Sequence, residues 1–162
     1  MDELTSTKGN VRSKLDILIE RQIGINNCWA AALSMALQNY GLHLTGKTLD
    51  EMFEANNQGL DLFTLHPQIS SHFAYVRTEY RSEIMGHDPK LTFAEIQGYI
   101  DNSQPVLIGT QNYGGHRAHA LLIIGYEGDD IVLIADPWTG SLVEMKHSEL
   151  INYWVESLVF DR

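Results

Sequence analysis

The chain has 162 residues and a formal net charge of −10, with 44 % hydrophobic and 20 % charged residues, a composition typical of one globular domain. The acidic charge argues against nucleic acid and anionic membranes as partners, since both attract clustered Lys and Arg. A single cysteine excludes an internal disulfide framework and a Cys-rich zinc site. The longest apolar run, Ala118–Tyr126 with His119 inside it, is too short to cross a membrane.

The N-terminal segment, residues 1–13, is polar and lacks the positive-then-apolar order of a secretory signal. We therefore expect a cytoplasmic protein, or one delivered into a target cell by a route without such a signal. A terminal domain of a longer parent chain would show the same start. Residues 1–162 are expected to form a single domain in which residues 1–13 are loosely held.

Helix signals dominate the first half of the chain. Cys28–Tyr40 combines strong helix formers with an apolar stripe, and Gly41 stands where a C-terminal cap belongs. Thr92 and Glu95 form a capping box that opens a helix to about Ile100. The other expected elements are a strand over 15–20, a loop over 21–27, a helix over 47–56, a helical turn over 65–71 and an edge strand over 74–81.

Strand signals dominate the second half. The expected strands cover residues 105–110, 119–127, 131–136, 141–146 and 155–160, with a loop over 111–118 and a short helix over 147–154. A helical run followed by a strand run predicts an α+β fold. Its N-terminal helical half, which carries Cys28, is expected to pack on a C-terminal antiparallel sheet.

Cys28 lies at the start of the longest expected helix, after Asn26 and Asn27, which are good N-cap residues. Helix N-termini favour a thiolate through their unpaired N–H groups and the helix dipole. A buried small hydrophobe is the other interpretation of a lone cysteine. Gln22, six positions earlier, carries an amide able to donate to an oxyanion formed at Cys28, or it is a solvent-facing loop residue.

A base and a carboxylate lie at one end of an expected hairpin. Folding the two strands about the Gly128–Asp129 turn brings His119 and Asp136 a short diagonal apart. Asp136 would then fix the tautomer and orientation of the imidazole. A buried hydrogen bond that only closes the hairpin is the alternative, and the presence of Cys28 and Gln22 favours the functional interpretation.

His116 is a rival base, three residues before His119, and both histidines cannot occupy one position against Cys28. We expect His116 to be exposed, at the rim of a substrate groove or without a role. The remaining histidines, which show no metal-binding spacing, are His43, His66, His72, His87 and His147. The sequence therefore predicts no metal site, and it suggests no cofactor.

The ordered set Gln22, Cys28-Trp29, His119 and Asp136 resembles the papain-like cysteine proteases. The strand HALLIIGY and the segment DPWTG are similar to the histidine strand and the Asn-Ser-Trp-Gly segment of that fold. The resemblance implies a papain-like α+β fold with Cys28 as nucleophile, His119 as base, Asp136 as orienting residue and Gln22 as oxyanion donor. It covers about two thirds of the chain, and residues 42–104 are not diagnostic.

The same resemblance places a substrate groove between the helical half and the sheet half. Trp29 is expected to be a core aromatic as well as part of the family signature, and Trp138 is expected to shield the His119–Asp136 pair from water. The residues expected to contact substrate are Trp29, Gly114, Gly115, His116 and Trp138, with the loop over 111–118 and residues 57–61 on the rim.

Two departures from papain itself point to a compact bacterial branch of these proteases. The third member is Asp and not Asn, and only 91 positions separate Cys28 from His119. The chain is similar to avirulence-type effector proteases and to leader peptidases that cleave after Gly-Gly. Leader peptidases usually have Gly where Trp29 stands, which favours an effector, or a toxin against rival bacteria with a cognate inhibitor protein. The expected partner is a protein substrate, cleaved at a Gly-Gly site in the leader-peptidase case.

Two other functions stay open at this point. Cys–His–Asp sites also deamidate glutamine or transfer acyl groups through the same thioester chemistry. A non-catalytic binding module with a structural cysteine is the third interpretation, and it leaves Gln22, His119 and Asp136 without a joint explanation.

Overall fold

A buried helix at the centre of the molecule fixes the position of the rest. The computed structural model describes residues 11–161, and in it helix α2 (Cys28–Gln38) is buried at every residue from Trp29 to Leu37. Four of these residues are alanines, and the helix packs both on strand β4 (His116–Glu127) and on the helix that follows it, where Ala31 lies against Gly46. Cys28 thereby begins its helix at the surface of the sheet.

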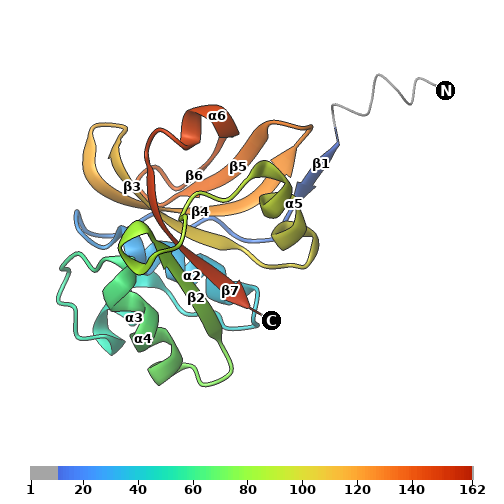
Figure 1. Ribbon diagram of the computed structural model, residues 1–162. Helices are drawn as coiled ribbons and strands as arrows, with labels where there is room; N and C mark the ends of the chain where they lie inside the picture. Colours follow the sequence, from blue (N-terminus) through green and yellow to red (C-terminus); the bar gives the residue numbers. More distant parts are fainter. Residues whose placement is uncertain (1–10, 162) are drawn as a thin grey trace.

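The other helices of the described chain are α3 (Gly46–Met52), α4 (Leu62–His72), the 3-10 turn η1 (Glu83–Met85), α5 (Phe93–Asp101) and α6 (His147–Leu150). Thr45, Asp61 and Thr92 cap α3, α4 and α5 by accepting hydrogen bonds from backbone N–H groups three residues later. In Figure 1, α2, α3 and α4 gather below the sheet, whereas α5 and α6 lie along its upper part.

One antiparallel sheet forms the other half of the fold, as the sequence predicted. Its strands in the described chain are β1 (Arg12–Lys14), β2 (Arg77–Ser82), β3 (Val106–Tyr113), β4, β5 (Ile131–Asp136), β6 (Ser141–Lys146) and β7 (Trp154–Asp161). Their order is β2-β7-β3-β4-β5-β6, and β1 pairs with β4 outside this path. The last strand in the chain thus lies between β2 and β3, with β2 at the edge as expected.

Strand β4 changes neighbours along its length. Its first part pairs with β3, as in Thr110 with His119, and its last part pairs with both β5 and β1. The register with β5 places Leu122 opposite Ala135 and shifts by one residue between Ile123 and Gly125. The pairing of β4 with β5 begins only at Leu122. His119 therefore pairs with β3 on one side and lies beyond the paired part of β5 on the other.

One expectation about the N-terminal part was wrong. Residues 15–20 do not form a strand, because the Leu18 N–H and C=O both bond the side chain of Gln38 instead of a neighbouring strand. A strand lies earlier, at Arg12–Lys14, and includes the last two residues of the segment 1–13 that was expected to be loosely held. Residues 1–10 of that segment lie outside the described residues.

The middle of the chain also differs from the sequence prediction. The turn expected over 65–71 is the full helix α4, which starts earlier at its Asp61 cap and tolerates Pro67. The helix expected over 47–56 ends at Met52, and Asn56 and Asn57 have positive φ.

The segment 111–118 is not a flexible loop. β3 and β4 run through it and are joined by Gly114 and Gly115 alone, with φ of +58° and +82°. Positive φ at both central residues is what a two-residue type I′ hairpin requires, and glycine adopts it without strain.

Gly125 is required for β1 to reach β4, because a Cβ at this position would lie 2.4 Å from the Ser13 carbonyl oxygen. We expect Gly125→Ala to lower the free energy of unfolding by about 1–3 kcal/mol in urea titrations. Gly98→Ala is the matched control, because Gly98 lies inside α5 with nothing within 4 Å of its Cβ position. This control should raise stability by up to about 1 kcal/mol. Equal effects of the two substitutions would contradict the close approach of β1.

Candidate active site

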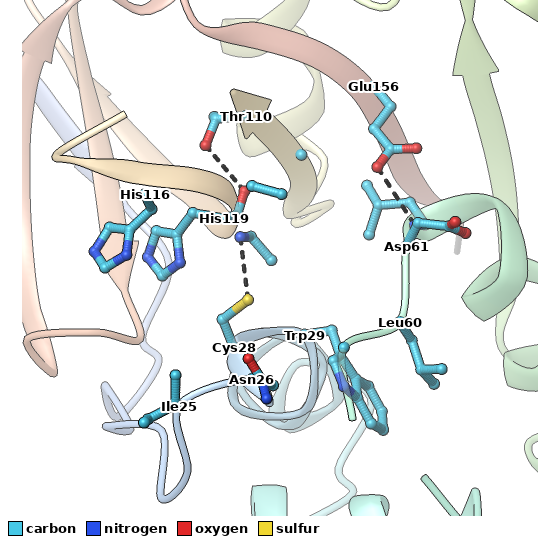
Figure 2. A pocket seen from close by; sticks show the side chains of 15 residues that line it. Ile25, Asn26, Cys28, Trp29, Leu60, Asp61, Thr110, His116, His119 and Glu156 are labelled. Atoms are coloured by element: carbon cyan, nitrogen blue, oxygen red, sulfur yellow. Dashed lines mark hydrogen bonds between the residues drawn. The ribbon is translucent and has the colours of Figure 1, made fainter. Parts of the chain in front are cut away.

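A cavity of about 270 Å³ lies between the helical half and the sheet half. It is lined from α2 and the preceding loop, from the segment before α4, and from β3, β4 and β7 (Figure 2). Cys28 lies on its helical wall and His119 on its sheet wall, the arrangement expected from the sequence. Its lining residues are Ile25, Asn26, Cys28, Trp29, Gly59, Leu60, Asp61, Leu62, Gly109, Thr110, His116, Ala118, His119, Ala120 and Glu156.

Cys28 is the first residue of α2 and is partly exposed. Its Sγ accepts a hydrogen bond of 3.4 Å from the Ala120 N–H, the backbone group directly after His119 (Figure 2). The Asn27 side chain accepts from the Gly24 N–H and does not cap the helix. The first backbone N–H groups of α2 therefore receive no side-chain cap from Asn27. They lie at the end of the helix that carries the Cys28 sulfur, where they favour negative charge.

His119 and Asp136 meet as the hairpin geometry predicted. The His119 Nε2 and the Asp136 Oδ1 are 2.7 Å apart, and the two side chains are only 3 % and 8 % exposed. Asp136 Oδ1 also accepts from the Trp138 N–H at 2.9 Å. The Thr110 hydroxyl donates to the His119 carbonyl at 2.9 Å, which holds the backbone on the β3 side. With Nε2 bound to the carboxylate, Nδ1 is the ring nitrogen left for Cys28.

The protonation of His119 depends on these two partners. Burial alone would lower the pKa of His119, but the hydrogen bonds with Asp136 and Cys28 and their negative charges outweigh it and raise the pKa to about 9. The imidazolium form is thus favoured at neutral pH, as a thiolate–imidazolium pair requires.

His116 lies against His119 and not in its place. The two rings stack with centroids 4.6 Å apart, and the Trp138 ring meets His116 edge-on at 4.6 Å. Burial and the neighbouring His119 lower the pKa of His116, so it stays neutral beside the imidazolium. Trp138 is 41 % exposed, and its backbone N–H donates to Asp136. The His116 ring therefore lies between His119 and Trp138, and the Tyr113 ring also stacks on His119, with centroids 6.4 Å apart.

Gln22 does not line the cavity of Cys28. Its Nε2 donates to the carbonyls of Gly24 and Ile25 at 2.8 and 3.1 Å, so both amide hydrogens are engaged within the loop. Its Oε1 is buried and has no hydrogen-bond partner among the described residues. Its backbone N–H donates to the Pro137 carbonyl at 2.7 Å, which ties the loop to the residue after Asp136.

The other residues expected to contact substrate are split between cavity and surroundings. Trp29 is fully buried, stacks on Phe53 with centroids 5.6 Å apart, and lines the cavity wall, in line with its expected core role. Gly114 and Gly115 form the hairpin turn and are outside the cavity lining. From the expected rim, Gly59 to Asp61 do line the cavity.

Sequence reasoning missed Glu156, which lines the cavity from β7. The only available signal was an acidic residue inside the mostly apolar run from Val155 to Phe160. Among the described residues, no cluster of three or more His, Cys, Asp or Glu side chains is arranged to hold a metal ion. None of the helices within residues 11–161 is long and apolar enough to cross a membrane.

Comparison with known proteins assigns the family. No curated protein sequence matches the chain significantly. The family model described as "Peptidase_C39 like family" matches residues 14–157. The chain belongs to this family. As a member of the Peptidase_C39-like family it is a cysteine peptidase, and the resemblance to papain-like proteases is confirmed.

Solved structures show the same papain-like α+β fold. A putative C39-like peptidase from Bacillus anthracis is 15 % identical, with a TM-score of 0.70 over 94 % of this chain and 98 % of that one. The peptidase domain of Streptococcus ComA, a bifunctional ABC transporter of a quorum-sensing pathway, is 17 % identical, with a TM-score of 0.65 over 87 % and 95 %. A double glycine motif protease from an AMS/PCAT transporter, in complex with its leader peptide, is 14 % identical, with a TM-score of 0.66 over 91 % and 93 %.

The rate of Cys28 alkylation distinguishes the roles of the two cavity histidines, His116 and His119. A His119 imidazolium close to Cys28 would stabilise the thiolate, so we expect His119→Ala to slow alkylation by iodoacetamide at pH 6 about tenfold or more, whereas His116→Ala keeps most of the rate. The adduct is unambiguous in intact mass, since Cys28 is the only cysteine. The exposed His43, changed to Ala, serves as the matched control. The reverse ranking of the first two variants would assign the base to His116.

Proposed function

We propose that this Peptidase_C39-like protein is an endopeptidase that cleaves a protein or peptide target through Cys28, His119 and Asp136. The observation that carries the proposal is the shared cavity in which His119, bound to Asp136 at 2.7 Å, lies across from Cys28 at the start of α2. A purely structural His–Asp bond would not require a nucleophile opposite it.

In the proposed reaction, the Cys28 thiolate attacks the scissile carbonyl while His119 is imidazolium. His119 then gives its proton to the leaving amine, and an acyl-thioester remains on Cys28. Water, deprotonated by the neutral His119, attacks the thioester and releases the second product, which restores the ion pair. Asp136 keeps Nε2 protonated throughout and so orients Nδ1 toward sulfur and substrate.

Gln22 is proposed as an oxyanion donor together with the Cys28 N–H. Such a donor contributes about 3–4 kcal/mol to transition-state stabilisation. In the described state both Gln22 amide hydrogens bond loop carbonyls, so the proposal requires one of them to turn toward the substrate. The buried, unpartnered Oε1 makes the resting arrangement costly and supports such a change.

The target is proposed to be a peptide segment cut after Gly-Gly. One structural neighbour is a double glycine motif protease bound to a leader peptide, and another belongs to a bifunctional transporter. Delivery of this enzyme as an effector or toxin, and a cognate inhibitor protein, stay predictions. Deamidation and acyl transfer share the thioester step and are separated from proteolysis by the products.

We expect the wild-type protein to cleave a peptide with Gly-Gly at its centre about tenfold faster than the same peptide with Ala-Ala, because methyl groups crowd a narrow cavity. Cys28→Ala should lower the rate on the order of a thousandfold or more. Mass spectrometry of the products is the measurement, since new termini show hydrolysis. Activity retained in Cys28→Ala would refute the nucleophile, and a gain of about one mass unit on Gln without a new terminus would show deamidation.

The pH profile tests the ion pair. Since the raised pKa of His119 keeps the imidazolium up to about pH 9, kcat/KM should fall as pH rises through about 9. Asp136→Asn keeps a hydrogen-bond acceptor but removes the charge, so the fall should move to lower pH by about one unit or more. An alkaline limb that does not move in Asp136→Asn would separate Asp136 from the titration of His119.

A further inference from the structure

A carboxylate lies within the cavity, away from the cysteine and the histidines. Figure 2 shows Glu156 and Asp61 on the side opposite His116, with Cys28 between them. Glu156 projects from β7, whereas Asp61 is exposed at the start of α4. Neither residue has a part in the proposed chemistry.

Two backbone features direct Glu156 into the cavity. The register of β3 with β7 shifts at this point, because Gly109 pairs with Glu156 and Thr110 pairs with Trp154, which leaves Val155 unpaired. Such a bulge re-aims the side chain beside it and is common near active sites. Gly109 provides the space, since a Cβ there would lie 2.6 Å from the Glu156 carboxylate.

The partners of Glu156 leave its charge uncompensated. The Tyr80 hydroxyl donates to Oε1 at 2.7 Å, and the Leu62 N–H approaches Oε2 at 3.5 Å. No ion pair among the described residues includes Glu156 or Asp61. Burial and the charge of Asp61 raise the pKa of Glu156, so a cation in the cavity would relieve an unfavourable local charge.

We propose that Glu156 makes this end of the cavity a specificity subsite for a Lys or Arg side chain of the substrate. The inference rests on the proposed endopeptidase function and names part of the sequence that the enzyme selects. The aliphatic stem of the cationic residue would lie along Leu60 and Leu62, and its charged end would reach Glu156, with Asp61 at the entrance. A charge-assisted hydrogen bond to a partly buried carboxylate is stronger and less screened than one at the surface.

The test uses peptidyl chloromethyl ketones that alkylate Cys28 in the full chain. Each reagent is an acylated pentapeptide with Gly-Gly at the reactive end, Ala elsewhere, and Lys, norleucine, Gln or Glu placed in turn at each of the other three positions. Second-order inactivation rates are followed by intact mass. At one position we expect Lys to react about tenfold faster than norleucine, and Glu to be slowest.

Glu156→Gln retains acceptors for Tyr80 and Leu62 but removes the charge, and it should bring the Lys-to-norleucine ratio to about one. Asp61→Asn, which keeps a good helix cap, should lower the ratio by about two- to threefold and covers the case in which Glu156→Gln does not fold. Glu79→Gln is the matched control, because it removes the same single negative charge at an exposed position of β2. It should keep the wild-type ratio.

Equal rates for Lys and norleucine at all three positions, or a preference for Gln over Lys, would overturn the subsite. A Lys preference that survives in Glu156→Gln and Asp61→Asn would overturn it as well. These outcomes leave the peptidase proposal intact, because Cys28 still reacts. If wild-type Cys28 reacts with neither iodoacetamide nor any reagent of the series, the proposed function fails and the subsite fails with it.

Discussion

The packing of α2 on β4 is the contact on which the rest of the structure depends. Four of the residues buried in this helix are alanines, and larger side chains in so closely packed an element would shift it and move Cys28 away from Ala120 and His119. β4 is in turn held by β1, β3 and β5, which leaves little freedom to absorb such a displacement. The proposed reactive pair, Cys28 and His119, comes from two elements 91 positions apart, and the packing of apolar residues without a chemical role fixes its geometry.

The environment of His119 combines two opposing physical effects. A buried imidazole in an apolar strand would normally stay neutral, and the acid and the thiol beside it reverse that tendency. The short segment after β5 contacts both Asp136 and the loop before Cys28. Trp138 donates its N–H to Asp136, and the Pro137 carbonyl accepts from Gln22. The carboxylate and the loop before Cys28 are therefore positioned by neighbouring peptide groups.

The parts of the site that follow local rules could be predicted from the sequence. Cys28 after two Asn residues marked a helix start, and the turn at Gly128 placed His119 beside Asp136 because the register of β4 with β5 shifts by only one residue along the hairpin. Thr92 and Glu95 formed the expected capping box, for the same local reason.

The parts that depend on long-range packing could not be predicted. Residues 15–20 alternate in polarity like a strand, yet the side chain of Gln38 takes their backbone bonds. The amide of Gln22 is engaged by carbonyls of its own loop, which sequence spacing does not reveal. Glu156 faces the cavity beside a bulge where β7 meets β3, and opposite a glycine of β3 that leaves space for its side chain. The pairing of two distant strands is not encoded in either strand alone.

The insertion of β7 between β2 and β3 has a consequence for the biosynthesis of the enzyme. On the ribosome, the segments that carry Cys28, His119 and Asp136 emerge before β7, but the sheet has a gap until Trp154–Asp161 can enter it. Such distant pairings form late in folding. A partly synthesised chain would therefore lack the finished cavity wall, and proteolytic activity would arise only once this region of the polypeptide is complete.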